Sequence, residues 1–356
     1  MPLTLNKHAW LRSAATCVLA GLAGWIVSLT GLPLGWMMGA MLAVAAASLL
    51  KLPAEQPTAL MPYVRASVGT MLGASVTAGL LLSFPEWWTS LVFLLIALLL
   101  SGSINFLLLS KLLRFQKPTA VLCAAPGGIA EMILLSEQAG ADQAKVAIVH
   151  ALRIALSILI LPLLIAWFMH VDVQRSAAGA TPSLSLIDTG WFLACIAAGV
   201  AADRWTRLPA RVIVVPLIVS AALHISGVTH FVVPEWVTNI VQVFIGINVG
   251  GRFLGISARQ LSHVVGAAFL VISVQIAIAF SAAILVARNS DLDPLALMLA
   301  YAPGGLAEMS LIAIAMGREV AFVGLHHLFR VMVSLALGPL LLSRLKRPAD
   351  KVDRDN

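Results

Sequence analysis

One set of ionisable residues occurs twice in this sequence with the same internal spacing. Its members are a glutamate, a histidine and an arginine, and the second set comes 177 positions after the first: Glu131, His150 and Arg153, then Glu308, His327 and Arg330. A carboxylate can carry a proton or bind a cation, and a histidine with an ordinary pKa of about 6.5 can relay protons. An arginine can balance charge or hold an anionic group. The sets therefore predict coupling of a proton or cation to the handling of a solute.

Each glutamate belongs to a motif rich in proline and glycine, APGGIAEM at 125–132 and APGGLAEM at 302–309. Proline and glycine break helices, and a helix that restarts after them has a positive N-terminus of about half a charge, which holds anions. We expect the backbone of both motifs to bind substrate, through Pro126, Gly127, Gly128, Pro303, Gly304 and Gly305. A hairpin after each motif would bring the glutamate towards the histidine and arginine of its own copy.

Two structural interpretations compete with this one. Each Pro-Gly-Gly can be a tight loop between packed helices, and the pairs Glu131–Arg153 and Glu308–Arg330 can be buried ion pairs that only fix the fold. A charge at the centre of a membrane costs about 2.5–3.5 kcal/mol on insertion scales. Charged residues duplicated in register favour a functional role over this structural one.

The composition predicts an all-α polytopic membrane protein. The chain has 356 residues, of which 60% are hydrophobic and 11% charged, whereas a soluble domain is about 45–50% apolar and about 25% charged. Apolar runs of about 17–25 residues suit membrane helices. The net charge of +7 is then expected in cytoplasmic loops and not at a nucleic-acid surface. No nucleotide, metal or redox motif is present, so we expect no cofactor, no metal site and no enzyme.

The register between the two motif regions holds without a gap over roughly forty residues, which predicts a duplicated unit. The predicted repeats span 8–168 and 187–345, with a polar linker at 169–186 and a polar tail at 346–356. Each repeat holds six apolar segments. In the first they lie near 10–29, 34–50, 60–82, 87–110, 119–136 and 143–169, and in the second near 187–202, 210–226, 236–254, 261–287, 295–316 and 320–343.

The distribution of positive charge indicates how these segments cross. Twelve crossings would place the stretch 203–211 and the stretch holding Arg252 and Arg259 outside, against the positive-inside rule. If the motif segment enters and returns, each repeat has five crossings and the second repeat is inverted. We therefore expect two inverted repeats of about five spans, each with a broken or re-entrant Pro-Gly-Gly helix. The predicted location is the cell inner (cytoplasmic) membrane, with both termini cytoplasmic.

Other polar and small residues have structural interpretations. Asn105 and Gln275 fall in corresponding segments and are expected to form interhelical hydrogen bonds. Gly250 and Gly251 suit close helix approach, and His326, which has no repeat counterpart, suits packing or an interface.

The doubled motif resembles the AbrB-type duplicated transmembrane family. The matching marks are APGGIAEM followed by HALR at 150–153, APGGLAEM followed by HLFR at 327–330, and a Leu-Pro pair near the start of each repeat. Members are labelled regulators of gene expression, and some are called ammonia monooxygenases. The resemblance covers essentially the whole chain and implies no established catalytic or substrate-binding residues.

Three functions are then open. The first is a secondary active transporter or exporter of a small molecule or ion, working by alternating access in the lipid bilayer, as a monomer or a homodimer. The second is a membrane-embedded sensor or regulator that affects gene expression through a partner or a transported metabolite. The third, a monooxygenase, needs a metal site that is typically histidine-rich, and the sequence shows no cluster of such ligands.

Overall fold

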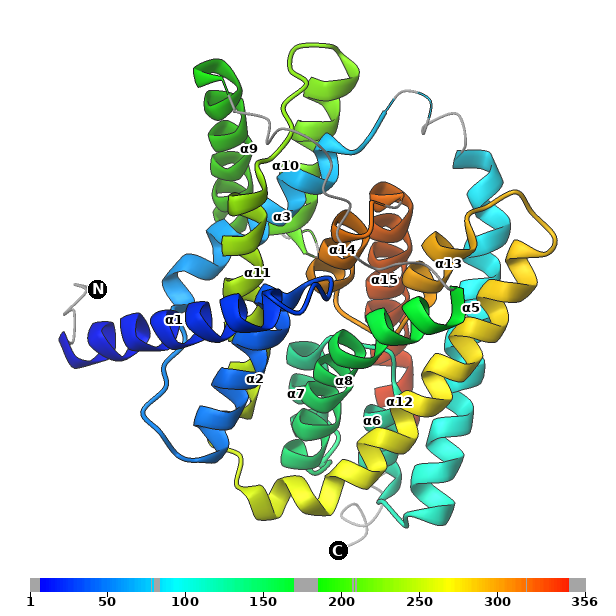
Figure 1. The fold of residues 1–356 in the computed structure, drawn as a ribbon. Coiled ribbons are helices and arrows are strands. Elements are labelled where there is room, and N and C mark those ends of the chain that lie inside the picture. Colours follow the sequence, from blue (N-terminus) through cyan, green and yellow to red (C-terminus); the bar gives the residue numbers. More distant parts are fainter. Residues whose placement is uncertain are drawn as a thin grey trace, which may run out of the picture.

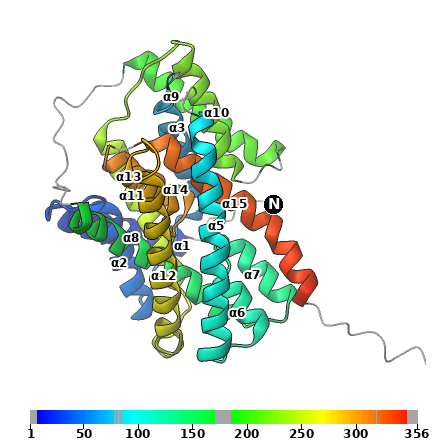
Figure 2. The same cartoon turned by 90° about the vertical axis from the view of Figure 1, so that its right-hand side faces the viewer.

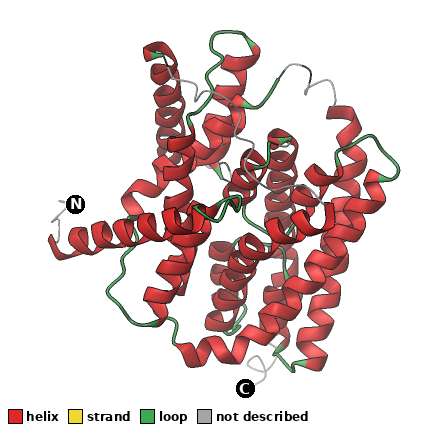
Figure 3. Cartoon of the chain, in the orientation of Figure 1, coloured by secondary structure: helices red, strands yellow, loops and turns green. Residues whose placement is uncertain are grey.

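The computed structural model describes residues 7–77, 79, 84–169, 185–206, 208, 210–317 and 319–345. Every regular element within these residues is a helix (Figure 3), as the composition predicted. The predicted tail, 346–356, and most of the predicted linker lie outside the described residues. The division into two repeats about that linker therefore stays a prediction. We call residues 7–169 the first half and residues 185–345 the second half.

The helices of the first half are α1 (Lys7–Ser28), α2 (Gly35–Leu49), α3 (Met61–Ala74), α5 (Trp87–Leu107), α6 (Lys117–Ala124), α7 (Ile129–Gln138) and α8 (Gln143–Met169). Those of the second half are α9 (Leu186–Trp205), α10 (Arg211–Ile225), α11 (Glu235–Gly250), α12 (Ala258–Ala287), α13 (Pro294–Tyr301), α14 (Leu306–Ala315) and α15 (Val320–Leu345). Each predicted apolar segment contains at least one helix, and each motif segment contains two.

Six of the described helices, α1, α5, α8, α9, α12 and α15, are long and apolar enough to cross a membrane. They identify the chain as a multi-pass membrane protein. Three further apolar helices, α2, α10 and α14, are shorter. By length and composition, fewer helices qualify as spans than the ten crossings that were predicted. A 15-residue helix such as α2 is about 22 Å long, against a hydrocarbon core of about 30 Å. Left-handed backbone at Leu34 and Lys51, with φ of 62° and 58°, marks the two ends of α2.

Two long helices, α5 and α12, run in opposite directions beside each other. In Figure 1, α5 descends from the upper right to the lower edge, whereas α12 climbs from the lower edge to the upper right. The two helices pack together, and Figure 2 shows them adjacent from a second side. α6 follows at the lower end of α5, and α13 follows at the upper end of α12 (Figure 1). The motif segments of the two halves are thus approached from opposite ends of the molecule.

Helices from different halves pack closely at glycines, where no side chain separates the backbones. α11 packs on α2, and α10 packs on α3. A Cβ added to Gly246 would lie 2.5 Å from the carbonyl oxygen of Met37, and one added to Gly250 would lie 2.5 Å from that of Met41. The expected role of Gly250 in close helix approach is therefore confirmed. These contacts hold the two halves together away from the motifs.

Candidate functional site

Each motif lies between two short helices, in the same way in both halves. α6 ends at Ala124 and α7 begins at Ile129, and in the second half α13 ends at Tyr301 and α14 begins at Leu306. We call residues 125–128 the first break and 302–305 the second break. Ala125 and Ala302, which precede the prolines, have φ/ψ of −64°/141° and −57°/142°. A proline disfavours the helical conformation in the preceding residue, so the sequence ends each helix locally.

The glycines of each break lie beneath side chains of their own motif. A Cβ on Gly127 would collide with the side chain of Met132, and the same holds for Gly304 and Met309. Both methionines are buried. A glycine at this position lets the methionine fold back over the break.

The second glycine of each break caps the following helix. Gly128 and Gly305 precede the first helical residue, and the carboxylates of Glu131 and Glu308 fold back over them. Each glutamate is the third residue of its helix, where a negative charge is favoured by the helix dipole. The helix N-termini that were expected to hold an anionic substrate are therefore next to carboxylates of the protein itself.

Each arginine of the duplicated set bridges two carbonyl oxygens of its break. Arg153 donates from Nη1 to Ala125 (3.1 Å) and from Nη2 to Gly127 (2.7 Å). Arg330 donates from Nη1 to Ala302 (2.7 Å) and from Nη2 to the oxygen of Gly304. The two arginines are 5% and 7% exposed. They compensate carbonyls that the interrupted helix leaves without intrahelical partners, and they hold the breaks against α8 and α15.

Each histidine binds the helix before its break. Nε2 of His150 donates to the carbonyl oxygen of Leu122 (2.8 Å), and Nε2 of His327 donates to that of Leu299 (3.0 Å). Because a carbonyl only accepts, Nε2 carries the proton in both rings. Both Nδ1 atoms are buried and have no hydrogen-bond partner among the described residues. The three hydrogen bonds of each half thus recur in the other half at positions 177 residues apart.

One hydrogen bond crosses from the second half to the first break. Ser334, on α15, donates to the carbonyl oxygen of Pro126 (3.0 Å) as well as to that of Arg330 (2.8 Å). Its counterpart Ser157 donates to the carbonyl oxygen of Arg153 (2.7 Å). The two breaks are therefore neighbours in space.

Both breaks open on one small cavity of about 20 Å³, which we call the central cavity. Pro126 and Arg153 line it from the first half, and Pro303 and Arg330 from the second. α5 and α12 supply further walls, including Gln275. This volume holds about one water molecule. The cavity brings together the prolines and arginines that the sequence singled out.

The glutamates do not share one environment. Glu308 is buried, and its Oε1 lies 3.6 Å from Nη2 of Arg252. Glu131 is exposed. Neither glutamate forms an ion pair with its own arginine among the described residues, because the arginines bind break carbonyls and Glu308 pairs with Arg252. Glu308 still interacts electrostatically with Arg330, as the expected approach implies. Sequence reasoning placed Arg252 among loop cations; the structure places it in the short helix Gly251–Phe253, with only 18% of its side chain exposed.

A polar cluster beside the central cavity was not predicted as a unit. Tyr301, which lines the cavity, donates to the carbonyl oxygen of Ser90 (2.5 Å). The hydroxyl of Ser90 lies 2.9 Å from Nε2 of His326. His326 was expected to serve packing, and it does so here against α5. Asn105 donates to the carbonyl oxygen of Val271 on α12 (3.2 Å), which confirms an interhelical hydrogen bond, whereas Gln275 faces the cavity.

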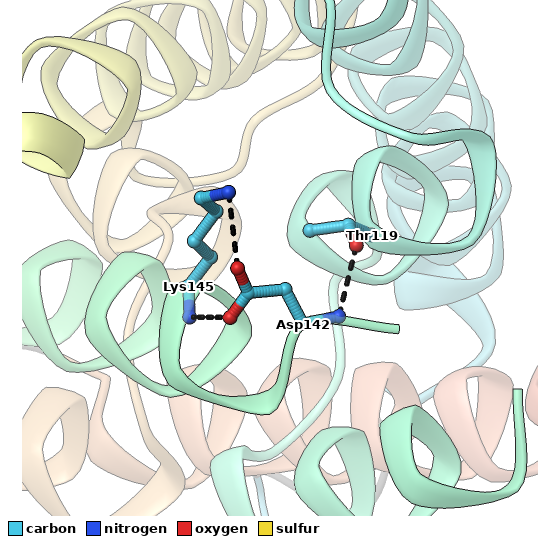
Figure 4. Close-up of polar contacts among 3 residues, drawn as sticks. All are labelled: Thr119, Asp142 and Lys145. Carbon is cyan, nitrogen blue, oxygen red and sulfur yellow. Dashed lines mark hydrogen bonds and ion pairs between the residues drawn. The ribbon is translucent and has the colours of Figure 1, made fainter. Parts of the chain in front are cut away.

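A separate contact fixes the start of α8 against the start of α6 (Figure 4). The backbone N–H of Asp142 donates to Oγ1 of Thr119 (3.0 Å), and the Asp142 carboxylate accepts from the Lys145 backbone (3.0 Å) and pairs with its Nζ (3.0 Å). Partial burial raises the pKa of Asp142, but these contacts with Lys145 lower it by more, so the pKa lies below its ordinary value. This anchor sets the base of the α6–α7 pair.

Comparisons with known proteins match nearly the whole chain, including both breaks. A family model described as "Transition state regulatory protein AbrB" matches residues 36–346. The "Uncharacterized protein YhjN" of Bacillus subtilis (strain 168) is 24% identical over 360 residues, covering 94% of this chain and 92% of that protein. The "Putative regulator AbrB" of Escherichia coli (strain K12) is 23% identical over 349 residues, covering 96% of this chain and 98% of that protein.

Proposed function

The chain belongs to the AbrB family, and we propose that it is a secondary active transporter or exporter of a small solute. The observation that carries the proposal is the central cavity, which both helix breaks line. Interrupted helices whose breaks meet near the middle of the bilayer are a recurrent way of building a transport site. Backbone freed from a helix at that depth is tolerated only inside protein or along a water-filled cavity.

The proposed architecture is a pair of inverted repeats, each with a re-entrant broken helix. Two observations support it. α5 and α12 run antiparallel and lead to motif segments at opposite ends of the molecule (Figure 1). The arginine and histidine contacts of the first half recur in the second half at the same spacing. Two inverted units can exchange conformations, so that the site opens first to one side and then to the other.

In this proposal the solute contacts the proline and arginine side of each break. The arginines hold the break carbonyls, and the glycines let methionine and glutamate fold back. Glu131 is the better candidate for proton or cation coupling because it is exposed, whereas Glu308 is held by Arg252. We further propose an inner-membrane location with both termini cytoplasmic, which the positive-inside rule supports.

The second candidate function is regulation of gene expression. It is favoured by the description of the family model and by the name of the Escherichia coli relative. We propose that any such effect is indirect and follows from movement of a metabolite across the membrane. A regulator that signals through a partner would need the partner for its effect, whereas a transporter acts alone in a purified system.

The test uses purified protein in proteoliposomes. Transient currents and internal pH are recorded upon addition of a panel of small anions, cations and weak acids. The double variant Glu131→Gln with Glu308→Gln is measured beside the wild type. A solute-dependent signal that is lost in the variant supports coupled transport through the carboxylates. A signal that persists keeps the transporter and removes the carboxylates from coupling. Silence across the panel, from protein shown to be folded, would count against transport and favour a search for a signalling partner.

A further inference from the structure

We propose that the central cavity binds a small anion, either an inorganic monoanion or the carboxylate group of a small organic acid. Binding stands on the geometry of the cavity alone. The corollary that this anion is the transported solute rests on the proposed function. The experiment below measures binding without transport, so that the two proposals can fail separately.

The charge around the cavity favours an anion. The residues that line it include two guanidinium groups, those of Arg153 and Arg330, and no carboxylate. Glu308 lies outside the lining, where it pairs with Arg252 and also interacts electrostatically with Arg330. Each arginine also binds carbonyls at the end of a helix, α6 or α13, and such an end carries about half a negative charge. Two positive charges against two such ends leave a net charge of about +1 in the cavity.

The two buried guanidinium charges destabilise the folded protein unless an anion lies between them. Both arginines are more than nine-tenths buried, and an uncompensated buried charge is strongly destabilising. Burial of the pair within one small cavity adds repulsion between like charges. A monoanion between them would remove both penalties.

The guanidinium of Arg153 has N–H donors that its contacts with the break do not use. A guanidinium carries five N–H donors, and the described contacts of Arg153 use one on each Nη atom. Its Nε–H is buried and has no partner among the described residues. The planar fork of arginine matches the two oxygens of a carboxylate. The second N–H of each Nη atom can therefore serve a ligand while the bonds to the break stay in place.

The size of the cavity sets the class of ligand. About 20 Å³ is room for about one water molecule, so only a compact charged group fits in this conformation. A halide fits the space by itself. A carboxylate would place its oxygens there, with the rest of a small acid outside the cavity.

The experiment measures the thermal unfolding midpoint of the purified protein at constant ionic strength. HEPES, an anion whose three-oxygen sulfonate is bulkier than a halide or a carboxylate, is replaced stepwise by chloride in one series and by acetate in another. We expect a saturable rise in the midpoint in at least one series, and the two series distinguish an inorganic anion from a carboxylate. Arg153→Gln should weaken the apparent affinity by more than about tenfold, since a buried partner of the anion is lost.

If Arg153→Gln does not fold, a second variant tests whether the central cavity binds an anion. Gln275→Glu places a carboxylate at the wall of the cavity, where it should replace the anion. We expect it to raise the midpoint in the HEPES reference buffer and to abolish the response to added chloride or acetate. Gln242→Glu is the matched control, because Gln242 is a buried glutamine on α11 outside the cavity lining; it should keep the wild-type response. Absence of any anion-specific response in the wild type, or an unchanged response in Gln275→Glu, would overturn the proposal.

Discussion

The carboxylate of Glu308 lies 3.6 Å from the guanidinium of Arg252, whereas Glu131, its counterpart 177 positions earlier, is exposed. Two motifs that differ at one position, Ile129 against Leu306, therefore hold their carboxylates in different environments. The difference arises outside the motifs, because Arg252 follows α11 and pairs with only one of the two glutamates. The two halves bind their breaks through the same arginine and histidine contacts. They differ in the environment of the glutamate beside each break.

This difference predicts unequal effects of neutralising the two glutamates. Glu308→Gln removes the carboxylate that faces Arg252, which is only 18% exposed, and should lower the free energy of unfolding by about 2 kcal/mol, somewhat less than for a fully buried pair. Glu131→Gln, at an exposed position, should change it by less than about 0.5 kcal/mol. The measurement is unfolding of each single variant in detergent, followed by tryptophan fluorescence. Equal losses of unfolding free energy in the two variants would show that the Glu308–Arg252 ion pair does not stabilise the fold.

Arg330 donates hydrogen bonds to two carbonyl oxygens at once, which predicts that lysine cannot replace it. A single ammonium cannot span the oxygens of Ala302 and Gly304 as the planar guanidinium does, so one carbonyl loses its charged donor. Arg330→Lys should cost about 2 kcal/mol of stability. Arg259→Lys is the control, since Arg259 is exposed at the start of α12 and should behave as the wild type. Comparable midpoints for the two variants would argue against a structural role of the fork.

Close packing of α11 on α2 predicts intolerance of a side chain at Gly246. A valine there would meet the Met37 carbonyl oxygen and the Cβ of Ala40, at 2.5 and 2.8 Å from its own Cβ, and backbone cannot move aside cheaply. Gly246→Val should cost about 1–3 kcal/mol or more. Gly266→Val, in a helix interior with no atom within 4 Å of the added Cβ, serves as the matched control. The yield of monodisperse protein and its unfolding midpoint report the effect, and a stable Gly246→Val protein would refute the close approach.

The anchor at the base of α6 and α8 predicts a dependence of stability on pH. Because the pKa of Asp142 is lowered in the folded protein, its contribution is present above the unfolded pKa of about 3.9 and is lost as the pH falls through the lower folded value. Asp142→Ala should cost about 0.5–1 kcal/mol near neutral pH, a modest value for a partly exposed helix start.

Asp142→Ala also tests whether the charge of Asp142 causes the pH dependence. The difference between wild type and Asp142→Ala should shrink towards acid pH, where the wild-type carboxylate is protonated. A stability difference that stays constant between about pH 3 and pH 7 would mean that the charge of Asp142 is irrelevant.

Much of the fold follows from local physics that the sequence displays. The apolar segments became helices because their length and composition suit a membrane, and each helix ended at its motif because proline and glycine cannot continue it. The identity of the arginines and histidines as site residues was also predicted, since charge is costly in a membrane. Their partners were not, because a guanidinium can satisfy itself with carboxylates or with carbonyls, and nothing in spacing alone distinguishes the two.

The sequence by itself determined the membrane class, the AbrB family resemblance, the positions of the two breaks and the residues that surround them. Only the tertiary structure decided that Arg153 and Arg330 bind break carbonyls, that Arg252 holds Glu308, and that both breaks line one cavity. These relationships join segments that are far apart along the chain. They depend on how α5, α8, α12 and α15 pack, and packing is set by the whole set of helices and not by any one stretch of sequence.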